Sequence, residues 1–324
     1  MPSITQGLLK AARAPLCKSE RAGVSVLLAG LLSAIFVTSP SAQTTQACID
    51  LERRFDSTFN DVSAPQKSSF LFSAADSGCE SVVSKALAGG ASLDARDREG
   101  GTPLTHAARA GRVKVIALML DKGAAIDQRD IKGSTPLYVA IEKSRVEAAQ
   151  LLIARGADVK TEGRSGVSTV AAAAFAGDDA MVDLLLAHGA DGKTPDSTGK
   201  PPIIYAAARG AGAIVSRLIA AGVDVNARYA ADQTALMWAA GYPSDTSDAK
   251  ALALASLLLD KGARIDDADD RGRTALMTAA ELDHVAMVDL LVSRGAKKDA
   301  RDKDGKSAAE ITTNVEIRAK LTGG

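Results

Sequence analysis

Residues 101–133, GTPLTHAARAGRVKVIALMLDKGAAIDQRDIKG, carry the signals of two helices followed by a polar turn. Thr102 can cap a helix that begins at Pro103, where the missing backbone N–H of proline costs nothing. Gly111 can end this short helix because glycine accepts a left-handed backbone. Apolar residues then recur on one face of a second helix, which we expect to end at Gly123. The stretch therefore predicts a helix–turn–helix unit that closes with a polar finger.

The same unit recurs every 33 residues, apart from a single step of 40. The positions equivalent to Thr102 are Ser69, Thr135, Ser168, Pro201, Thr234, Thr274 and Ser307. The glycines that follow the second helices keep the same spacing, at Gly90, Gly123, Gly156, Gly189, Gly222, Gly262 and Gly295. A fixed period of this length is typical of a solenoid built from stacked supersecondary units.

A T-P-L start, a G-A stop and a period near 33 resemble the ankyrin repeat. The resemblance begins at about Ser68 and continues to the C-terminus. It implies an all-α solenoid of helix–turn–helix units with β-turn fingers, and a concave surface that binds another protein. The expected repeats are 68–100, 101–133, 134–166, 167–199, 200–232, 233–272, 273–305 and, as a partial C-terminal cap, 306–324.

Ahead of the repeats, residues 43–67 are predicted to form an N-terminal cap, with a helix over residues 47–59 and a linker over residues 60–67 that contains Pro65. The apolar stripe of this helix consists of Ile49, Leu51, Phe55 and Phe59. A solenoid needs such an element because its first repeat would otherwise expose an apolar face.

Residues 1–42 have the pattern of a secretory signal peptide. Basic residues precede an apolar run over residues 22–37, and small residues lead to an expected cleavage site after Ala42. An uncleaved membrane anchor is the alternative, but the run is shorter than the roughly 20 residues that span a bilayer. We therefore expect a periplasmic or secreted protein without stable membrane insertion, and the style of the signal together with the alanine-rich composition favours a bacterial periplasm.

Export would remove Cys17 and leave Cys48 and Cys79. An even number of cysteines in an oxidising compartment predicts one disulfide between them. Two free buried thiols are the alternative.

The composition provides enough apolar residues for a core, at 46%, whereas 3% aromatic residues is low for a globular enzyme. The formal net charge is zero, and removal of residues 1–42 would leave a slight acidic excess. This balance gives no reason to expect nucleic acid or an anionic membrane as a partner. We expect a monomer.

Two departures from the repeat pattern affect the local geometry. The 40-residue step places seven extra residues between two helices, around residues 244–250, after Pro243 has ended the first helix. Asp232 stands where most fingers have glycine, and aspartate is one of the few residues that accept a left-handed backbone.

Histidine is absent from the position after T-P-L, where the resembled family uses it to connect neighbouring fingers. The residues at that position are Thr105, Tyr138, Ala171, Ile204, Met237 and Met277. That hydrogen bond is therefore expected to be absent or replaced.

No catalytic, cofactor or metal site is predicted. His106, His188 and His284 belong to separate repeats, and the acidic finger over residues 266–270 lacks the length and closing glutamate of a calcium hand. The repeats leave no room for a separate catalytic domain, so we expect no enzyme. An envelope enzyme with a site on the solenoid is the remaining catalytic alternative.

The predicted function is that of an adaptor, scaffold or inhibitor that binds a protein on the concave surface. Phe175, Arg209, Tyr229 and Tyr242 are the candidate partner-binding residues, because they combine exposed aromatic side chains with an arginine. Trp238 and Tyr205 share one position of the repeat and are predicted to lie in the core. A secreted effector that binds a host protein is the alternative with the same fold and site.

Overall fold

The computed structural model describes residues 40–58, 63–243 and 246–323. All of its regular elements in these residues are helices. They are α1 (Pro40–Thr58), α2 (Ala64–Ser77), α3 (Glu80–Ala88), α4 (Pro103–Ala110), α5 (Val113–Asp121), α6 (Pro136–Glu142), α7 (Val146–Ala154), η2 (Arg164–Gly166), α8 (Thr169–Ala176), α9 (Asp179–Ala187), α10 (Pro202–Ala208), α11 (Gly212–Ala220), η3 (Ala230–Asp232), α12 (Ala235–Ala240), α13 (Asp248–Asp260), α14 (Ala275–Glu281), α15 (Val285–Ser293), α16 (Ala308–Ile311) and α17 (Val315–Thr322).

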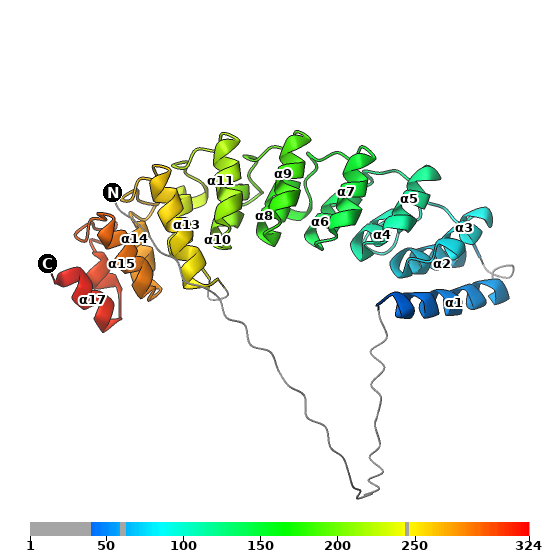
Figure 1. The fold of residues 1–324 in the computed structure, drawn as a ribbon, viewed down its shortest axis with the longest axis horizontal. Coiled ribbons are helices and arrows are strands. Elements are labelled where there is room, and N and C mark those ends of the chain that lie inside the picture. Colours follow the sequence, from blue (N-terminus) through cyan, green and yellow to red (C-terminus); the bar gives the residue numbers. More distant parts are fainter. Residues whose placement is uncertain (1–39, 59–62, 244–245, 324) are drawn as a thin grey trace, which may run out of the picture. The chain divides into compact units, whose positions relative to one another are not determined.

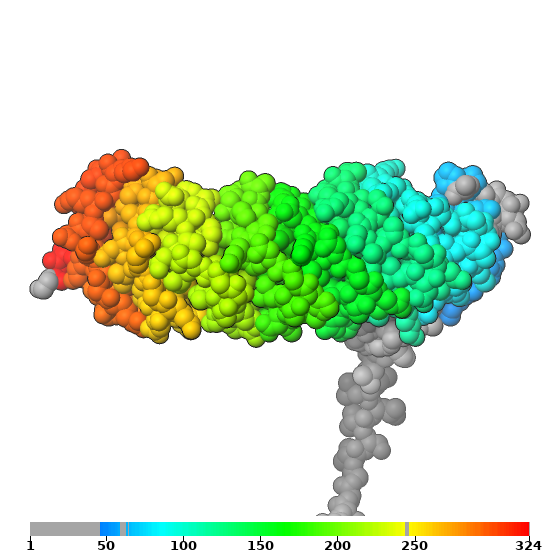
Figure 2. All heavy atoms as spheres, turned by 90° about the horizontal axis from the view of Figure 1, so that it is seen from above, coloured from blue at the N-terminus to red at the C-terminus, as the bar shows by residue number. Residues whose placement is uncertain are grey.

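From α2 onward the helices form pairs that stack in a curved row, with α4, α6, α8 and α10 on the inner side of the curve (Figure 1). Each inner helix packs on the inner helices of the adjacent repeats and on its own outer helix. Seen from above, the repeats follow one another in chain order along the row (Figure 2). Packing between neighbours is therefore what holds this part of the chain together.

The second repeat shows why these residues form this unit. The Thr102 hydroxyl accepts a hydrogen bond from the backbone N–H of Thr105 at 3.3 Å, and Pro103 opens α4. Gly111 ends the helix with a φ of 72°, as predicted. Ala107 and Ala108 are fully buried, and their small side chains let adjacent inner helices approach closely. The predicted caps and helices of residues 101–133 are confirmed.

The N-terminal side differs from the expectation. The predicted linker is wrong over residues 64–67, and so is the repeat start at Ser69, because α2 already begins at Ala64. Residues 60–62 of that linker lie outside the described residues. Pro65 does not prevent this, since proline is tolerated in the first turn of a helix. The side chain of Gln66 also accepts a hydrogen bond from the backbone N–H of Ser63 at 2.8 Å, which satisfies a donor at the helix start.

Helix α1 packs on both helices of the first repeat. Leu51 and Phe55 are buried, and the Phe55 ring meets Phe70 edge to face at 5.3 Å. Ile49 is 46% exposed, so its place in the predicted stripe is wrong. The predicted signal segment lies outside the described residues except at Pro40 to Ala42, where α1 begins, and Phe59 also lies outside them.

The extra residues of the 40-residue step do not all lie in a loop. Helix α13 begins at Asp248, so Asp248 to Lys250 lengthen the outer helix by nearly a turn. The hydroxyl of buried Thr246 donates to the carbonyl of Ala208 at 3.3 Å. This contact attaches the connection to the preceding repeat.

Replacing Gly189 or Gly222 by valine is expected to lower the free energy of unfolding by more than about 1 kcal/mol. Both glycines follow outer helices with positive φ angles, 85° and 90°, which a β-branched residue adopts only with strain. Urea denaturation of each variant measures the effect. Gly212→Ala is the control, because Gly212 has no positive φ and an added Cβ would meet its neighbours at ordinary contact distance. Unfolding curves of Gly189→Val and Gly222→Val that match the parent would contradict this account of the turns.

Candidate binding groove

Buried or half-buried aspartates organise most of the fingers. In the finger of the first repeat, the carboxylate of Asp97 accepts hydrogen bonds from the backbone N–H groups of Glu99 and Gly101, both at 2.8 Å. The same pair of bonds, to the residues two and four positions later, recurs at Asp130, Asp196, Asp269 and Asp302. These carboxylates hold each finger in one conformation. Asp269, which belongs to the acidic finger over residues 266–270, is buried in its turn.

Two fingers lack this aspartate and have Gly163 or Tyr229 in its place. There the backbone turns through residues with positive φ, Ser165 at 57° and Ala231 at 59°. The ring of Tyr138 occupies the space that a side chain at position 163 would need. A Cβ atom added to Gly163 would lie only 2.2 Å from the Cε1 atom of Tyr138. In the finger after Tyr229, Asp232 has a φ of 56°, which confirms the predicted left-handed aspartate.

Neighbouring fingers are connected without a histidine after T-P-L. Backbone N–H groups donate across the gap between fingers, for example from Ile131 to the Glu99 carbonyl at 2.9 Å. Arginine side chains add a second connection: Arg96 donates to the carbonyl of Arg129 at 2.7 Å, and Arg129 donates to that of Glu162 at 3.1 Å. The histidine bond of the resembled family is thus replaced, as expected. The replacing arginine ladder was not predicted, although the 33-residue spacing of Arg96 and Arg129 was its signal.

The fingers and the inner helices enclose two adjoining hollows. The first has a volume of about 540 Å³ and lies between the fingers of the first three repeats and helices α4 and α6. The second has a volume of about 560 Å³ and extends across α6, α8 and α10. Glu142, Lys143 and Arg164 line both hollows, so the two form one continuous groove, which we call the inner groove.

Phe175, Tyr205 and Arg209 form an aromatic and cationic cluster in the second hollow. The Phe175 side chain is 55% exposed, and its ring meets Tyr205 edge to face at 6.2 Å. The Arg209 guanidinium lies 5.5 Å from the centre of the Phe175 ring, within cation–π range. The Tyr205 hydroxyl donates to the Asp196 carboxylate, which fixes the ring against the finger. Burial and this hydrogen bond raise the pKa of Tyr205, so it stays protonated at neutral pH.

The other two candidate residues lie outside this hollow. Tyr242 is only 6% exposed, so its prediction as an exposed groove residue is wrong. Its ring stacks on His284 at 3.9 Å, and its hydroxyl donates to Asp248 at 2.8 Å, so residues from later in the chain cover it. Tyr229 is half-buried on its finger, where burial raises its pKa to about 12.

Tyr205 and Trp238 were predicted to be core residues, and both are partly exposed. Tyr205 lines the second hollow, and the ammonium of Lys200 lies 5.0 Å from the centre of the Trp238 ring. Each lies two residues after the T-P-L triplet of its repeat, as do Val139 and Ala172 in the preceding repeats. Comparing residue sizes along this position would have identified a column that faces the groove.

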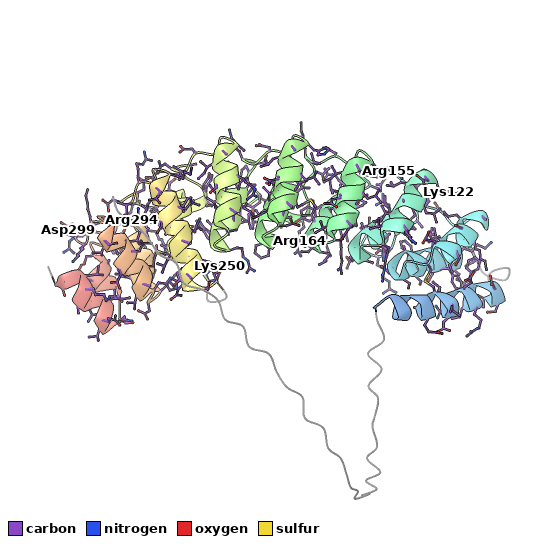
Figure 3. All side chains as sticks on the ribbon, viewed as in Figure 1. Lys122, Arg155, Arg164, Lys250, Arg294 and Asp299 are labelled. Atoms are coloured by element: carbon purple, nitrogen blue, oxygen red, sulfur yellow. A yellow bond between two sulfur atoms is a disulfide. The ribbon has the colours of Figure 1, made fainter. Side chains whose placement is uncertain are left out.

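Ion pairs within the third repeat surround Glu142, at the junction of the two hollows. Its carboxylate lies 2.8 Å from the Arg164 guanidinium and 3.5 Å from the Lys143 ammonium. Arg164 lies on the inner side of the curve, whereas Arg155 lies at the outer helices (Figure 3). A second pair, Lys132 with Glu99 at 3.1 Å, connects adjacent finger tips. These half-exposed pairs contribute little to stability, but they set the charge that a ligand would meet.

His106 connects the first finger to the first inner helix. Its Nδ1 atom lies 3.0 Å from Asp76, and its Nε2 atom lies 2.8 Å from Asp97. Burial by itself would lower the pKa of His106, but the hydrogen bonds to Asp76 and Asp97 outweigh it and raise the pKa above 6.5. Burial likewise opposes ionisation of Asp97, yet the hydrogen bond from His106 helps to lower its pKa.

Replacing His106 by glutamine is expected to destabilise the protein more at pH 5.5 than at pH 8.5. A raised folded pKa means that protonated His106 stabilises fully below about pH 6.5 and that this contribution is lost as the pH rises through the folded pKa. Asp97, with its lowered pKa, keeps its charge down to below its usual value of 3.8. Melting temperatures of parent and variant at both pH values test this. His188→Gln is the control, since His188 is exposed at the end of α9, and equal losses at both pH values for His106→Gln would contradict the assignment.

Among the described residues there is no group of three or more histidine, cysteine or acidic side chains that could hold a metal ion. Within those same residues no helix has the length and apolar character needed to cross a membrane.

A family model described as ankyrin repeats (3 copies) matches residues 71–163, 169–253 and 232–302. Among solved structures, the chain is similar to the crystal structure of the human ASB11 ankyrin repeat domain, with 25% sequence identity and a TM-score of 0.62. The similarity covers 69% of this chain and 99% of that one. No curated protein matches the sequence.

Proposed function

This chain belongs to the ankyrin-repeat family, and from that premise we propose that it is a non-catalytic module that holds a protein partner in the inner groove. Ankyrin repeats mediate protein–protein interaction, and their binding surface is formed by fingers and inner helices. The observation that carries the proposal is the second hollow, where an exposed phenylalanine is held between a tyrosine and an arginine. Large aromatic side chains next to arginine are typical of the residues that dominate binding energy at interfaces.

The proposed location is the cell envelope or the exterior of a bacterial cell, where the protein would act as an adaptor, scaffold or inhibitor. Two observations support export. Residues 1–42 have the pattern of a signal peptide, and the disulfide between Cys48 and Cys79 suits an oxidising compartment. Fractionation of the native organism, followed by detection with an antibody, tests this location. Detection in the cytoplasmic fraction alone would contradict it, and detection only in the medium would favour the secreted effector.

Phe175→Ala and Arg209→Ala are each expected to weaken binding of the partner by at least about thirtyfold, or about 2 kcal/mol. The partner is first captured from the envelope fraction with the parent protein and identified, and its affinity for each variant is then measured. Val315→Ala is the matched control, because Val315 is also an exposed apolar residue but lies on α17, far along the chain from the groove.

Circular dichroism must show that the variants remain folded. Unchanged affinity of Phe175→Ala and Arg209→Ala, combined with a loss for Glu281→Ala, which lies outside both hollows, would contradict the groove assignment. Binding would then run along the charged rim of the fingers.

A further inference from the structure

We propose that the occupant of the inner groove is an extended, acidic peptide segment with one large apolar side chain. This inference rests on the proposed function and adds the chemical class of the partner. It follows from the length of the groove, from a notch expected in its floor and from the distribution of charge along it.

The length of the groove favours an extended chain. The residues that line the two hollows extend from the finger of the first repeat to Arg209, which follows α10. The groove therefore crosses the inner helices α4, α6, α8 and α10. Packed helices lie about 8–10 Å apart, so three steps correspond to roughly 25–30 Å. An extended chain advances about 3.3 Å per residue, which gives a segment of about eight or nine residues.

Ala172 lines the second hollow and has a smaller side chain than its counterparts in the adjacent repeats, so we expect a notch there. The residues in the same repeat position on either side are Val139 and Tyr205, which are both larger. Phe175 and Val167 line the same hollow, so the notch has apolar walls. A partner that inserts one leucine, phenylalanine or tryptophan there would bury apolar surface against the partly exposed Phe175 and Tyr205 rings.

The charges of the groove favour an acidic occupant. Its basic lining residues are Arg98, Arg109, Lys132, Lys143, Arg164 and Arg209, and its acidic ones are Asp97, Glu99, Asp130 and Glu142. Asp97 and Asp130 have an oxygen engaged by their own finger backbones. Among the described residues, Arg98 and Arg109 have no carboxylate within ion-pair distance. The chain as a whole has no net charge, so this local excess is a property of the groove.

Glu142 is the internal competitor for the ligand carboxylate. It pairs with Arg164 and Lys143 at the point where the two hollows meet. An acidic side chain of the partner would have to displace Glu142 from one of these cations. Removing the charge of Glu142 should therefore strengthen binding of an acidic peptide, whereas the affinity for a purely apolar ligand should not change.

The test uses three pools of fluorescent nine-residue peptides and the purified full-length protein. Each peptide of the first pool has one leucine, phenylalanine or tryptophan at a varied position, three glutamates and otherwise glycine, serine or alanine. The second pool has glutamine and the third has lysine in place of glutamate. A fluorescent single-stranded oligonucleotide of twelve thymidines serves as a polyanion without apolar side chains.

The expected result is at least tenfold tighter binding of the glutamate pool than of the glutamine pool, and no binding of the lysine pool. Arg164→Glu should reduce binding of the glutamate pool at least tenfold, whereas Lys122→Glu, the same charge change at an exposed site of the outer side, should not (Figure 3). Glu142→Gln should increase it severalfold. Ala172→Trp should abolish binding by filling the notch, and Phe175→Ala provides a second test should the tryptophan variant not fold.

Equal binding of the glutamate and glutamine pools would overturn the acidic class, and so would an absence of binding by all three pools. Tighter binding of the oligonucleotide than of the glutamate pool would assign the groove to a nucleic acid instead and would also overturn the proposal. The proposed function is judged separately, by whether Phe175→Ala loses the partner captured from the envelope. Loss of that partner would support the proposed function even if the peptide pools showed that the ligand is not acidic.

Discussion

Replacing Cys48 and Cys79 together by alanine is expected to lower the free energy of unfolding of the N-terminal end by about 3–4 kcal/mol. The structure joins these cysteines in a disulfide between α1 and the start of α3, with a sequence separation of 31 residues. In the chain-entropy model, closing a loop of this length restricts the unfolded chain by about that amount. The loss should appear mainly in α1, α2 and α3, because repeats in a solenoid contact only their neighbours.

Hydrogen exchange resolves the position of this effect, with α14 and α15 as the internal control. Protection should fall in the first repeat of the double variant and stay unchanged in the C-terminal repeats. Adding a reducing agent should destabilise the parent and leave the variant unaffected. In the unreduced, denatured protein that lacks residues 1–42, titration should find no free thiol, and two free thiols would contradict the bridge.

Replacing Tyr242 by alanine is expected to lower the free energy of unfolding by about 3 kcal/mol, because the Tyr242 side chain is part of the core and not of the groove. Tyr242 is almost fully buried between repeats, where its ring stacks on His284 and its hydroxyl bonds to Asp248. His284 itself reaches back from the next repeat and donates through Nδ1 to the carbonyl of Ala240 at 2.9 Å. Truncating the tyrosine would therefore open a cavity at the contact between two repeats.

Urea unfolding of a matched set tests this assignment. Tyr242→Phe, which removes only the hydroxyl, should cost about 1 kcal/mol. Phe175→Ala removes an aromatic ring of similar size that is largely exposed, so its stability should change by less than about 1 kcal/mol while binding is lost. Equal stability of Tyr242→Ala and the parent would show that this side chain is not a core residue.

The local features of the repeat were predictable from the sequence, since they depend on residues a few positions apart. A threonine hydroxyl reaches a backbone N–H three residues later, so Thr102 indicates a helix start by itself. A positive φ is a property of a single residue, so Gly111 and Asp232 could both be placed correctly. The start at Ser69 was wrong because the 33-residue phase was extended into a terminal repeat, where Ser63 and Gln66 supply an earlier helix start.

The exposure of individual side chains was less predictable. Tyr242 and Phe175 lie near the ends of inner helices in their repeats, yet one is buried and the other exposed. The difference arises from His284, which is 42 positions beyond Tyr242 and covers it from the next repeat. The groove likewise depends on several repeats, because the residues that line it come from the fingers and inner helices of successive repeats.

The sequence alone was enough to predict the all-α solenoid of ankyrin repeats, its helix caps and its turn residues. Each of these depends on hydrogen bonds and backbone angles within one repeat, and the 33-residue period repeats that information along the chain. The folded structure was needed to identify the aromatic residues that face solvent, the carboxylates that hold the fingers and the position of the groove. Those properties arise where side chains from successive repeats meet, and burial at such contacts depends on the size and charge of residues that are distant in the sequence.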